Sequence, residues 1–402
     1  MESPPRPPAH TVGVSPNPLN PKVEEKSNAL AVTITQNAFS LSLPTSDHQT
    51  HESLSKKSGK NYNALLTINY VLLFVGSISS TLVSKYYFIH KGSSKWVSTF
   101  VQSAGFPLLV LPVYLPFISG CTRRRPFTGF TSRILLLSIA VGILLGVSNL
   151  LFSWGNSYLP VSTSSLLLSS QLAFNLILSI IIVKQEVNFL NLNCVVLLTL
   201  SSVLLALSSS HDRPTGLTQT RYWVGFFSTL GAGLLFALYL PVMETIYRKV
   251  YCYGMVVEMQ LVMEIAATAF SAAGMAAGGG FSNMWVESAK VFDGGPAVYW
   301  LTIAGNLVVW QLSFLGTAGM VFMTSSLTGG ICMTALMAAN VAGGVLVYGD
   351  GFGGVKAVAA GVCVWGFCSY LYGMYAKRKE REVQNNRLPI IHGGEGDLRG
   401  DC

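Results

Sequence analysis

From Asn61 onward, the sequence consists of apolar stretches of roughly 20 residues, separated by short charged or Gly/Pro-containing breaks. A helix of about that length crosses the hydrocarbon core of a bilayer. The stretches are continuous, whereas the strands of a membrane barrel alternate apolar and polar residues. The pattern therefore predicts ten transmembrane helices, over residues 64–87, 96–118, 133–153, 160–182, 189–209, 222–246, 254–277, 298–316, 319–347 and 353–375. The least distinct boundary is the eighth, where only "FLGTAG" separates two stretches.

The two ends of the chain differ in composition from its middle. Residues 1–60 are rich in Pro, Ser, Thr and Asn, which predicts a disordered tail without the apolar core of a cleaved signal peptide. The residues after Lys377 are also polar. The predicted organisation is a tail at 1–60, a first five-helix half at 61–209, an outer loop at 210–221, a second five-helix half at 222–376 and a tail at 377–402.

Charge and tryptophan positions predict the orientation in the membrane. Only 11% of the residues are charged, against about 25% in soluble domains. The net charge of +8 lies in loops, so it predicts topology rather than nucleic-acid binding. Lys and Arg favour the cytoplasmic side, which places both termini there. Five tryptophans then fall at outer helix ends or loops, where indoles favour the interface, namely Trp96, Trp154, Trp223, Trp285 and Trp300.

Two segments of the chain resemble each other. "WGNSYLPVSTSSL" (154–166) aligns with "LGTAGMVFMTSSL" (315–327), and "FVQ" (100–102) aligns more weakly with "EMQ" (258–260). Both alignments place a part of the first five helices on the corresponding part of the second five. Because five is odd, the second half would enter the membrane in the opposite orientation. This predicts an inverted-topology repeat, which is typical of transporters with a site near the membrane midplane.

The predicted fourth helix, "PVSTSSLLLSSQLAFNLILSIIIV", carries many polar side chains. Its serines and threonine can return hydrogen bonds to the backbone and allow close helix packing. Gln171 and Asn175 are harder to bury, and their spacing of four residues places them on one helix face. Such a face normally borders protein or a water-filled cavity rather than lipid. Hydrogen bonding between helices is the alternative.

Amides predominate among the other polar side chains near the middle of the predicted helices. These side chains are Asn69, Gln102, Asn149, Gln260, Glu264, Asn306, Gln311 and Asn340. An amide offers a donor and an acceptor together, and it can pair with a heterocycle whose edge does the same. The indole of Trp310 could stack on a flat ring.

We expect the substrate contacts to come from these amides and from tryptophan. The candidates are Gln102, Trp154, Gln171, Asn175, Gln260, Trp310, Gln311 and Asn340. In particular, Gln171, Asn175, Gln260 and Gln311 are expected to line one cavity. No Lys or Arg lies deep in a predicted helix, so phosphorylated substrates are not expected.

A proton carrier would have to be a carboxylate, because all six histidines lie outside the predicted helices. Glu264 lies about ten residues into the seventh helix, or ~15 Å deep, where burial favours the neutral form and no deep cation is available. Glu258 lies nearer the start of that helix. Glu244 has Arg248 one turn away, which predicts an ion pair at a helix end. We expect Glu264 to carry the proton, slightly ahead of Glu258.

Neither catalysis nor a bound cofactor is indicated. The sequence has no HExxH, no GxSxG with plausible partners and no Walker lysine. Its seven cysteines are scattered without CxxC or Cys/His spacing, so neither a zinc site nor a disulfide framework is expected.

The segments "SWGNSYLPVSTSSLLLSSQLAFN", "ALYLPVMETIYRKV", "EMQLVME" and "GMVFMTSSLTGGICMTALMAANVAGGVLVYGDGFGGVKAVAAGVCVWGFCSYLYG" closely resemble the plant purine permease family of the drug/metabolite transporter superfamily. The resemblance covers Asn61 to Lys377. It implies a ten-helix, proton-coupled importer of adenine and related bases, including cytokinins. We expect the plasma membrane as its location, with an endomembrane as the alternative. Glu264 lies just outside the "EMQ" motif, which favours Glu258 as a proton site shared by the family.

The resemblance leaves substrate and assembly open. Some members of the family move alkaloids or vitamin B6 forms, so another small organic solute is the alternative substrate, and a receptor or scaffold is a further alternative. The expected partners are a small heterocycle, protons and lipid, without nucleic acid. The oligomeric state is open.

Overall fold

A computed structural model describes residues 47–120, 122–184, 189–209, 218–350 and 353–387, and these residues are helices joined by short connections. The helices are α2 (Asp47–Ile89), α3 (Lys95–Ser103), α4 (Pro107–Ile118), α5 (Ser132–Tyr158), α6 (Val161–Ser169), α7 (Gln171–Leu178), the π-helical turn η1 (Ser179–Val183), α8 (Phe189–Ser209), α9 (Gln219–Tyr247), α10 (Tyr253–Ala277), α11 (Gly280–Val286), the π-helical turn η2 (Glu287–Val291), α12 (Gly295–Met323), α13 (Ser326–Tyr348) and α14 (Gly354–Arg387).

The chain divides into two compact units, Met1–Lys60 and Asn61–Cys402, and the second unit contains the features described below. Two ends of helices differ from the expected organisation. The helix α2 begins at Asp47, inside the predicted disordered tail, and α14 continues to Arg387, past the predicted helix end at residue 375 and into the predicted tail at 377–402. Residues 1–46, 210–217 and 388–402 of the predicted tails and outer loop lie outside the described part of the chain.

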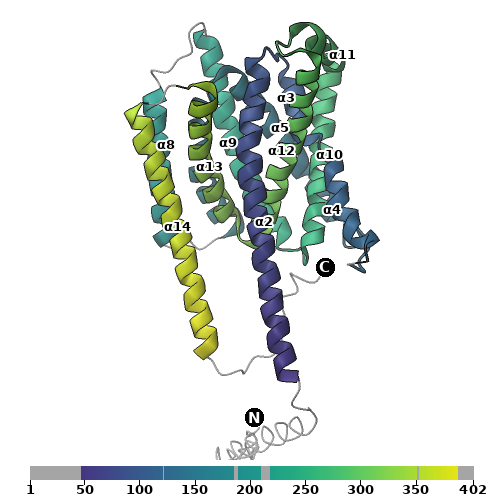
Figure 1. The fold of residues 1–402 in the computed structure, drawn as a ribbon, viewed down its shortest axis with the longest axis vertical. Helices are drawn as coiled ribbons and strands as arrows, with labels where there is room; N and C mark the ends of the chain where they lie inside the picture. Colours follow the sequence, from purple (N-terminus) through teal and green to yellow (C-terminus); the bar gives the residue numbers. More distant parts are fainter. Residues whose placement is uncertain (1–46, 121, 185–188, 210–217, 351–352, 388–402) are drawn as a thin grey trace, which may run out of the picture. The chain divides into compact units, whose positions relative to one another are not determined.

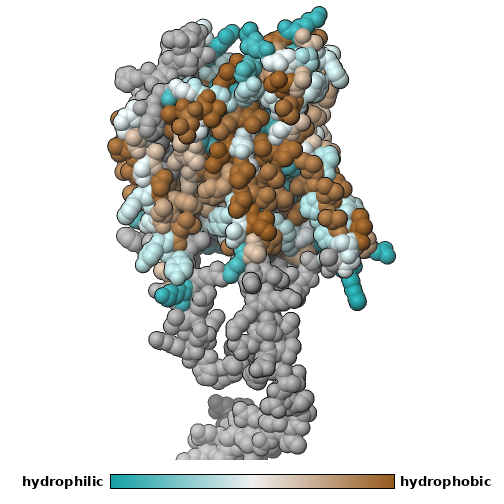
Figure 2. Space-filling model, viewed as in Figure 1, coloured by the Kyte–Doolittle hydropathy of each residue, from teal (hydrophilic) through white to brown (hydrophobic). Residues whose placement is uncertain are grey.

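Among the described residues, eight helical segments are long and apolar enough to span a membrane. They are Tyr62–Ile89, Lys95–Ile118, Ser132–Tyr158, Val161–Val183, Gln219–Tyr247, Tyr253–Ala277, Gly295–Met323 and Ser326–Tyr348. Figure 2 shows apolar side chains over the middle of one face, with hydrophilic ones towards its upper and lower ends. The protein is thus an all-helical, multi-pass membrane protein.

The predicted fifth and tenth spans lie in α8 and α14, which pack against each other (Figure 1). Their apolar stretches, Leu192–Ser201 and Ala357–Gly373, are shorter than the other candidate spans. The count of ten spans and the division into two inverted halves therefore remain predictions.

The predicted boundary between the eighth and ninth spans is wrong. The helix α12 continues through "FLGTAG" to Met323, and the break falls at Thr324 and Ser325. The glycines of "FLGTAG" make a helix less favourable by only about 1 kcal/mol each, so packing can keep them inside one, whereas a serine can cap the start of the next helix. Here the Ser325 hydroxyl accepts a hydrogen bond from the Thr328 N–H at 3.2 Å. In the alignment of the two similar segments, the α5–α6 break falls four residues earlier than this one, so the two breaks are out of register.

Two predicted spans are interrupted helices. Between α3 and α4 the chain leaves the helix after Ser103 and resumes at Pro107. The fourth span is broken at Ser170 between α6 and α7, and its π-helical turn ends at Val183, followed by Lys184 with a φ of 52°. Interruptions of this kind are tolerated at membrane depth where neighbouring helices cover the freed backbone groups.

Close helix contacts hold the centre of the second unit together. The largest buried apolar cluster joins α5, α9, α10 and α12, and α5 packs against both α9 and α10 (Figure 1). At the contact of α2 with α12, a Cβ at Gly316 would lie 2.4 Å from the Leu73 nitrogen. Only glycine permits this approach, as is common where membrane helices meet.

Candidate functional site

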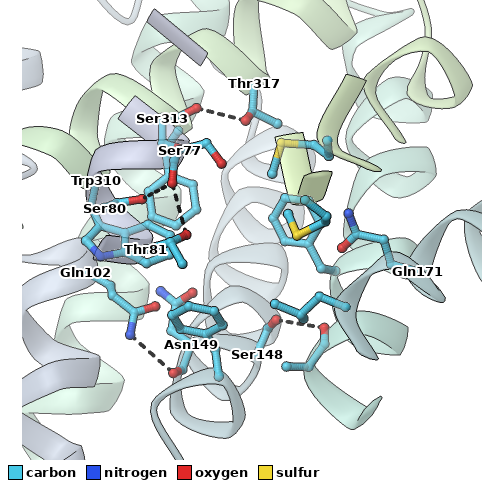
Figure 3. Close-up of a pocket in the computed structure, with 17 residues that line it drawn as sticks. Ser77, Ser80, Thr81, Gln102, Ser148, Asn149, Gln171, Trp310, Ser313 and Thr317 are labelled. Atoms are coloured by element: carbon cyan, nitrogen blue, oxygen red, sulfur yellow. Dashed lines mark hydrogen bonds between the residues drawn. The ribbon is translucent and has the colours of Figure 1, made fainter. Parts of the chain in front are cut away.

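A cavity lies between α2, α3, α5, α6, α7, α9, α12 and α13, with a volume of about 60 Å³. This is several times the ~10–15 Å³ that one water molecule needs. Its apolar lining is Phe152, Leu168, Ala232, Phe236, Trp310, Phe314, Met333 and Met337. Its polar lining, labelled in Figure 3, is Ser77, Ser80, Thr81, Gln102, Ser148, Asn149, Gln171, Ser313 and Thr317. The described lining includes no charged side chain.

An aromatic group forms one wall of the cavity. The Trp310 ring lies 5.5 Å from that of Phe152, edge to face, and 5.3 Å from that of Phe314. The Trp310 Nε1–H donates to the Ser84 hydroxyl at 3.1 Å, and that hydroxyl donates to Asn306 Oδ1 at 3.2 Å. The polar edge of the indole is thereby satisfied within the protein. Its ring remains part of the cavity wall, where it can pack against a flat ligand.

Three buried amide atoms beside the cavity have no hydrogen-bond partner. They are Gln102 Oε1, Asn149 Nδ2 and Gln171 Nε2, and each of the three side chains is at least nine-tenths buried. A buried polar atom without a partner costs about 1–3 kcal/mol. The cavity therefore offers hydrogen-bonding capacity that a polar ligand can use.

Glu264 is fully buried on α10 and is bonded by two amides. Gln260 Nε2 donates to its Oε1 at 2.9 Å, and Gln311 Nε2 donates to its Oε2. The Tyr239 hydroxyl donates to Gln260 Oε1 at 3.4 Å. No ion pair to Glu264 occurs within the described ranges.

Glu258, one and a half turns earlier on α10, has a different environment. Arg124, from the segment before α5, donates from Nη1 and Nη2 to its two carboxylate oxygens, each at 2.9 Å. Burial alone would lower the pKa of Arg124, but the hydrogen bonds and charge of Glu258 outweigh it, and the pKa is raised. Glu258 is therefore neutralised by a cation from outside the predicted helices, whereas the lack of a deep cation was expected for Glu264.

Glu244 forms the predicted ion pair with Arg248, at 3.0 Å. Its second oxygen accepts the N–H of Ser326 at 2.7 Å, at the first residue of α13. The carboxylate thus joins the end of α9 to the start of α13, which is a structural role.

The expected substrate contacts fall into separate places. Gln102, Gln171 and Trp310 line the cavity. Asn340 lies just behind the lining, with its Nδ2 donating to the Thr81 hydroxyl at 3.4 Å.

The other expected contacts are absent from the described lining of the cavity. Asn175 Nδ2 donates to the Ser326 carbonyl at 3.0 Å, and the Lys95 ammonium lies 5.3 Å above the Trp154 ring. Gln260 and Gln311 bond Glu264 instead. Hence the expectation that Gln171, Asn175, Gln260 and Gln311 share one cavity is wrong, because the last three are hydrogen-bonded to Ser326 or Glu264 outside the described lining.

Sequence reasoning missed part of the cavity wall. Asn149 was recognised as a polar residue near the middle of a helix but not as a substrate contact. Ser77, Ser80 and Thr81 of α2 were not selected. Their spacing in "GSISSTLVS" places small polar groups on one helix face, which is the signal that could have identified them.

Known proteins resemble this chain along most of its length. The PUNUT family model, described as purine nucleobase transmembrane transport, matches residues 64–380. "Probable purine permease 4" of Arabidopsis thaliana is 64% identical over 74% of this chain and 78% of its own. "Purine permease 3" of the same plant is 35% identical over 77% of this chain and 90% of its own. A solved structure, titled only "Crystal structure of protein", has a TM-score of 0.51 at 13% identity, covers 76% of this chain and 97% of that one, and supports the fold alone.

Proposed function

The chain belongs to the plant purine permease family and is a membrane transporter of purine nucleobases rather than an enzyme, and from this premise we propose that it imports adenine and adenine derivatives such as cytokinins together with protons. The observation that carries the proposal is the cavity with the Trp310 ring in its wall, unpartnered amide atoms beside it and no charge in its described lining. A neutral, flat, hydrogen-bonding heterocycle matches these three properties.

We place the substrate against Trp310, with Gln102, Asn149 and Gln171 supplying hydrogen bonds. Ser77, Ser80 and Thr81 add hydroxyls on the α2 side. Phosphorylated forms are excluded in this proposal, because a phosphate without a basic partner would remain uncompensated in the cavity.

We assign the coupling proton to Glu264. The two amides that bond it, Gln260 and Gln311, provide no positive charge, so the ionised form at this depth is penalised by several kcal/mol. Gln311 directly follows Trp310 in α12, so neighbouring residues of one helix reach the proton site and the substrate cavity. Movement of α12 would then affect both sites, as coupling of two ligands to one conformational equilibrium requires.

Uptake of labelled adenine into host cells that lack their own adenine transport tests the proposal. Wild type should concentrate adenine, more strongly at acid external pH, and AMP should not compete where adenine does. A Glu264→Gln variant resembles the protonated state, so it should still exchange adenine across the membrane but lose uphill accumulation and acid stimulation.

The matched control is Glu258→Gln on the same helix, which should retain acid-stimulated uptake. If Glu264→Gln concentrates adenine with normal pH dependence and Glu258→Gln does not, the proton site is Glu258. If both variants behave as wild type, coupling through α10 is wrong. An alkaloid or vitamin B6 form that displaces labelled adenine at far lower concentration than adenine itself would favour the alternative substrate class.

We further propose ten spans in two inverted halves, a plasma-membrane location and cytoplasmic termini. The support is the positive charge and tryptophan distribution together with the helical segments α8 and α14 in the predicted fifth and tenth positions. Imaging of a tagged protein and the accessibility of terminal tags from outside intact cells test this part. A terminal tag that is labelled without permeabilisation at the plasma membrane would contradict the orientation.

A further inference from the structure

Gln102 is held in one amide orientation by its surroundings. Its Nε2 lies 3.1 Å from the Ser98 carbonyl oxygen and 3.4 Å from the Asn149 carbonyl oxygen. Both are backbone acceptors that cannot donate. A flipped amide would place Oε1 against these two oxygens, so the assignment of nitrogen and oxygen follows from the contacts.

A third contact strengthens this orientation. Gln102 Nε2 also lies 2.8 Å from the Ser153 hydroxyl oxygen. The single proton of that hydroxyl is donated to the Ser98 hydroxyl at 3.1 Å, so its oxygen is available to Gln102 only as an acceptor. Three acceptors from α3 and α5 thus surround the amide nitrogen.

The oxygen of the same amide remains unused. Gln102 is fully buried and lines the cavity, and its Oε1 has no partner. Figure 3 shows Gln102 and Asn149 on the same side of the cavity and Gln171 across from them. Since the nitrogen cannot exchange places with it, Oε1 presents a permanent acceptor to any ligand.

We infer that Gln102 is the residue that selects 6-amino purines over 6-oxo purines, by accepting a hydrogen bond from the exocyclic N–H. This inference rests on the proposed function. A fixed acceptor needs a fixed donor, and the exocyclic amino group donates in every ring tautomer, whereas the ring N–H moves between nitrogens. The neighbouring Asn149 amide, whose Nδ2 has no partner, can donate to the adjacent ring acceptor.

A 6-oxo purine has the same shape but presents an oxygen at that position. Two oxygens would then face each other without a proton between them, in a buried site. A loss of about tenfold or more in affinity is expected, because a binding site designed for a donor leaves its buried acceptor unpaired when the donor is replaced.

Inhibition of labelled adenine uptake by unlabelled adenine and by hypoxanthine tests the inference, since the two bases differ in the 6-substituent and the accompanying ring proton but hardly in size. In wild type, the inhibition constant of hypoxanthine should exceed that of adenine by about tenfold or more. In Gln102→Leu, whose side chain has a similar volume, the affinity for adenine should fall. The ratio of the hypoxanthine to the adenine inhibition constant should fall to within about threefold of one. In Gln171→Leu, across the cavity, the affinity for adenine should fall while the ratio of the two inhibition constants stays as in wild type.

The inference is overturned by an equal affinity of wild type for the two bases, which needs no variant to be measured. It is also overturned by a Gln102→Leu protein that reaches the membrane and keeps the wild-type ratio. Saturable adenine uptake without a preference for adenine contradicts the role of Gln102 alone. Absence of saturable adenine uptake in wild type contradicts the proposed function as well.

Discussion

Arg124 and Glu258 form one ion pair, but removing Arg124 should destabilise the protein more than removing Glu258. Each carboxylate oxygen receives one N–H from the guanidinium at 2.9 Å. The Glu258 side chain is 3% exposed and that of Arg124 is 15% exposed. The carboxylate is fixed on a buried helix face, whereas the arginine belongs to the segment before α5 and lies at the edge of the protein.

The loss of unfolding free energy depends on which of the two charges remains in the protein after the substitution. Removing Arg124 leaves a buried carboxylate without a cation, which costs about 3–5 kcal/mol in fully buried pairs. Because the arginine is partly exposed, we expect the lower end, about 3 kcal/mol. Removing Glu258 leaves a guanidinium that can turn towards water, so the expected loss is about 1 kcal/mol.

Denaturant unfolding of the purified protein in micelles measures these differences. Arg124→Gln should lose about three times as much unfolding free energy as Glu258→Gln, and the double variant should lose less than the sum of the two. The exposed pair of Lys91 and Asp293, with 67% and 45% exposed side chains, is the matched control. Lys91→Gln should change stability by less than about 1 kcal/mol. Equal losses in the two single variants with an additive double variant would refute the reasoning.

Three further predictions concern helix packing, ring orientation and pH. Gly316→Ala should destabilise the protein by about 1–3 kcal/mol or more, because the added Cβ would meet the backbone of Leu73 at 2.4 Å. Gly305→Ala on the same helix should leave stability unchanged in thermal unfolding, because nothing lies within 4 Å of its Cβ. Ser84→Ala removes the acceptor of the Trp310 N–H, so it should raise the KM for adenine several-fold and change tryptophan fluorescence at normal expression. Burial raises the pKa of Glu287 above its usual value of 4.5, so the folded state binds that proton more tightly than the unfolded state does. The stability of the protein should therefore fall as pH rises from about 4.5 through the raised pKa. In unfolding measured at several pH values, Glu287→Gln should flatten this dependence.

The sequence predicted helix positions well where the physical signal is the length of an apolar run. It failed at the eighth boundary, where "FLGTAG" resembles a turn by its glycines. In a membrane, glycine and other small residues also lie inside helices, where they allow close helix packing. Gly316 is an example, since it lies inside α12 against α2. The actual break carries a serine cap, a weaker sequence signal than two glycines.

The sequence predicts how deep in the membrane a candidate residue lies, but not whether its side chain points into the cavity. A residue count from the helix end gives the depth of Gln102, Gln171 and Trp310, and all three line the cavity. Gln171 and Asn175 share a helix face by spacing, yet only the first lines it. What a polar helix face contacts depends on which other helices pack against each of its turns. That information is long-range, and spacing within one helix does not contain it.

The ion pair of Glu258 could not be predicted from the linear sequence. Arg124 lies outside the apolar stretches, so no spacing pattern pairs it with Glu258, although its long side chain reaches that carboxylate. Glu244 is neutralised by Arg248, as predicted. The pairing of these two carboxylates with arginines distinguishes them from Glu264.

The partners of Glu264 support the proposal that this carboxylate binds and releases the coupling proton. An arginine stabilises only the ionised form, so it opposes protonation. An amide has a donor and an acceptor, and rotation of its end group lets it bond either form of the acid. Gln260 and Gln311 now donate to Glu264, and Gln311 Oε1 has no partner. A half-turn of that one amide would let it accept the proton of the neutral acid, so Gln311 can keep a hydrogen bond to Glu264 in either protonation state. Gln311→Leu should therefore impair proton-coupled uptake even though it leaves Glu264 in place, and a Gln311→Leu transporter with wild-type acid stimulation would contradict this role of the amide.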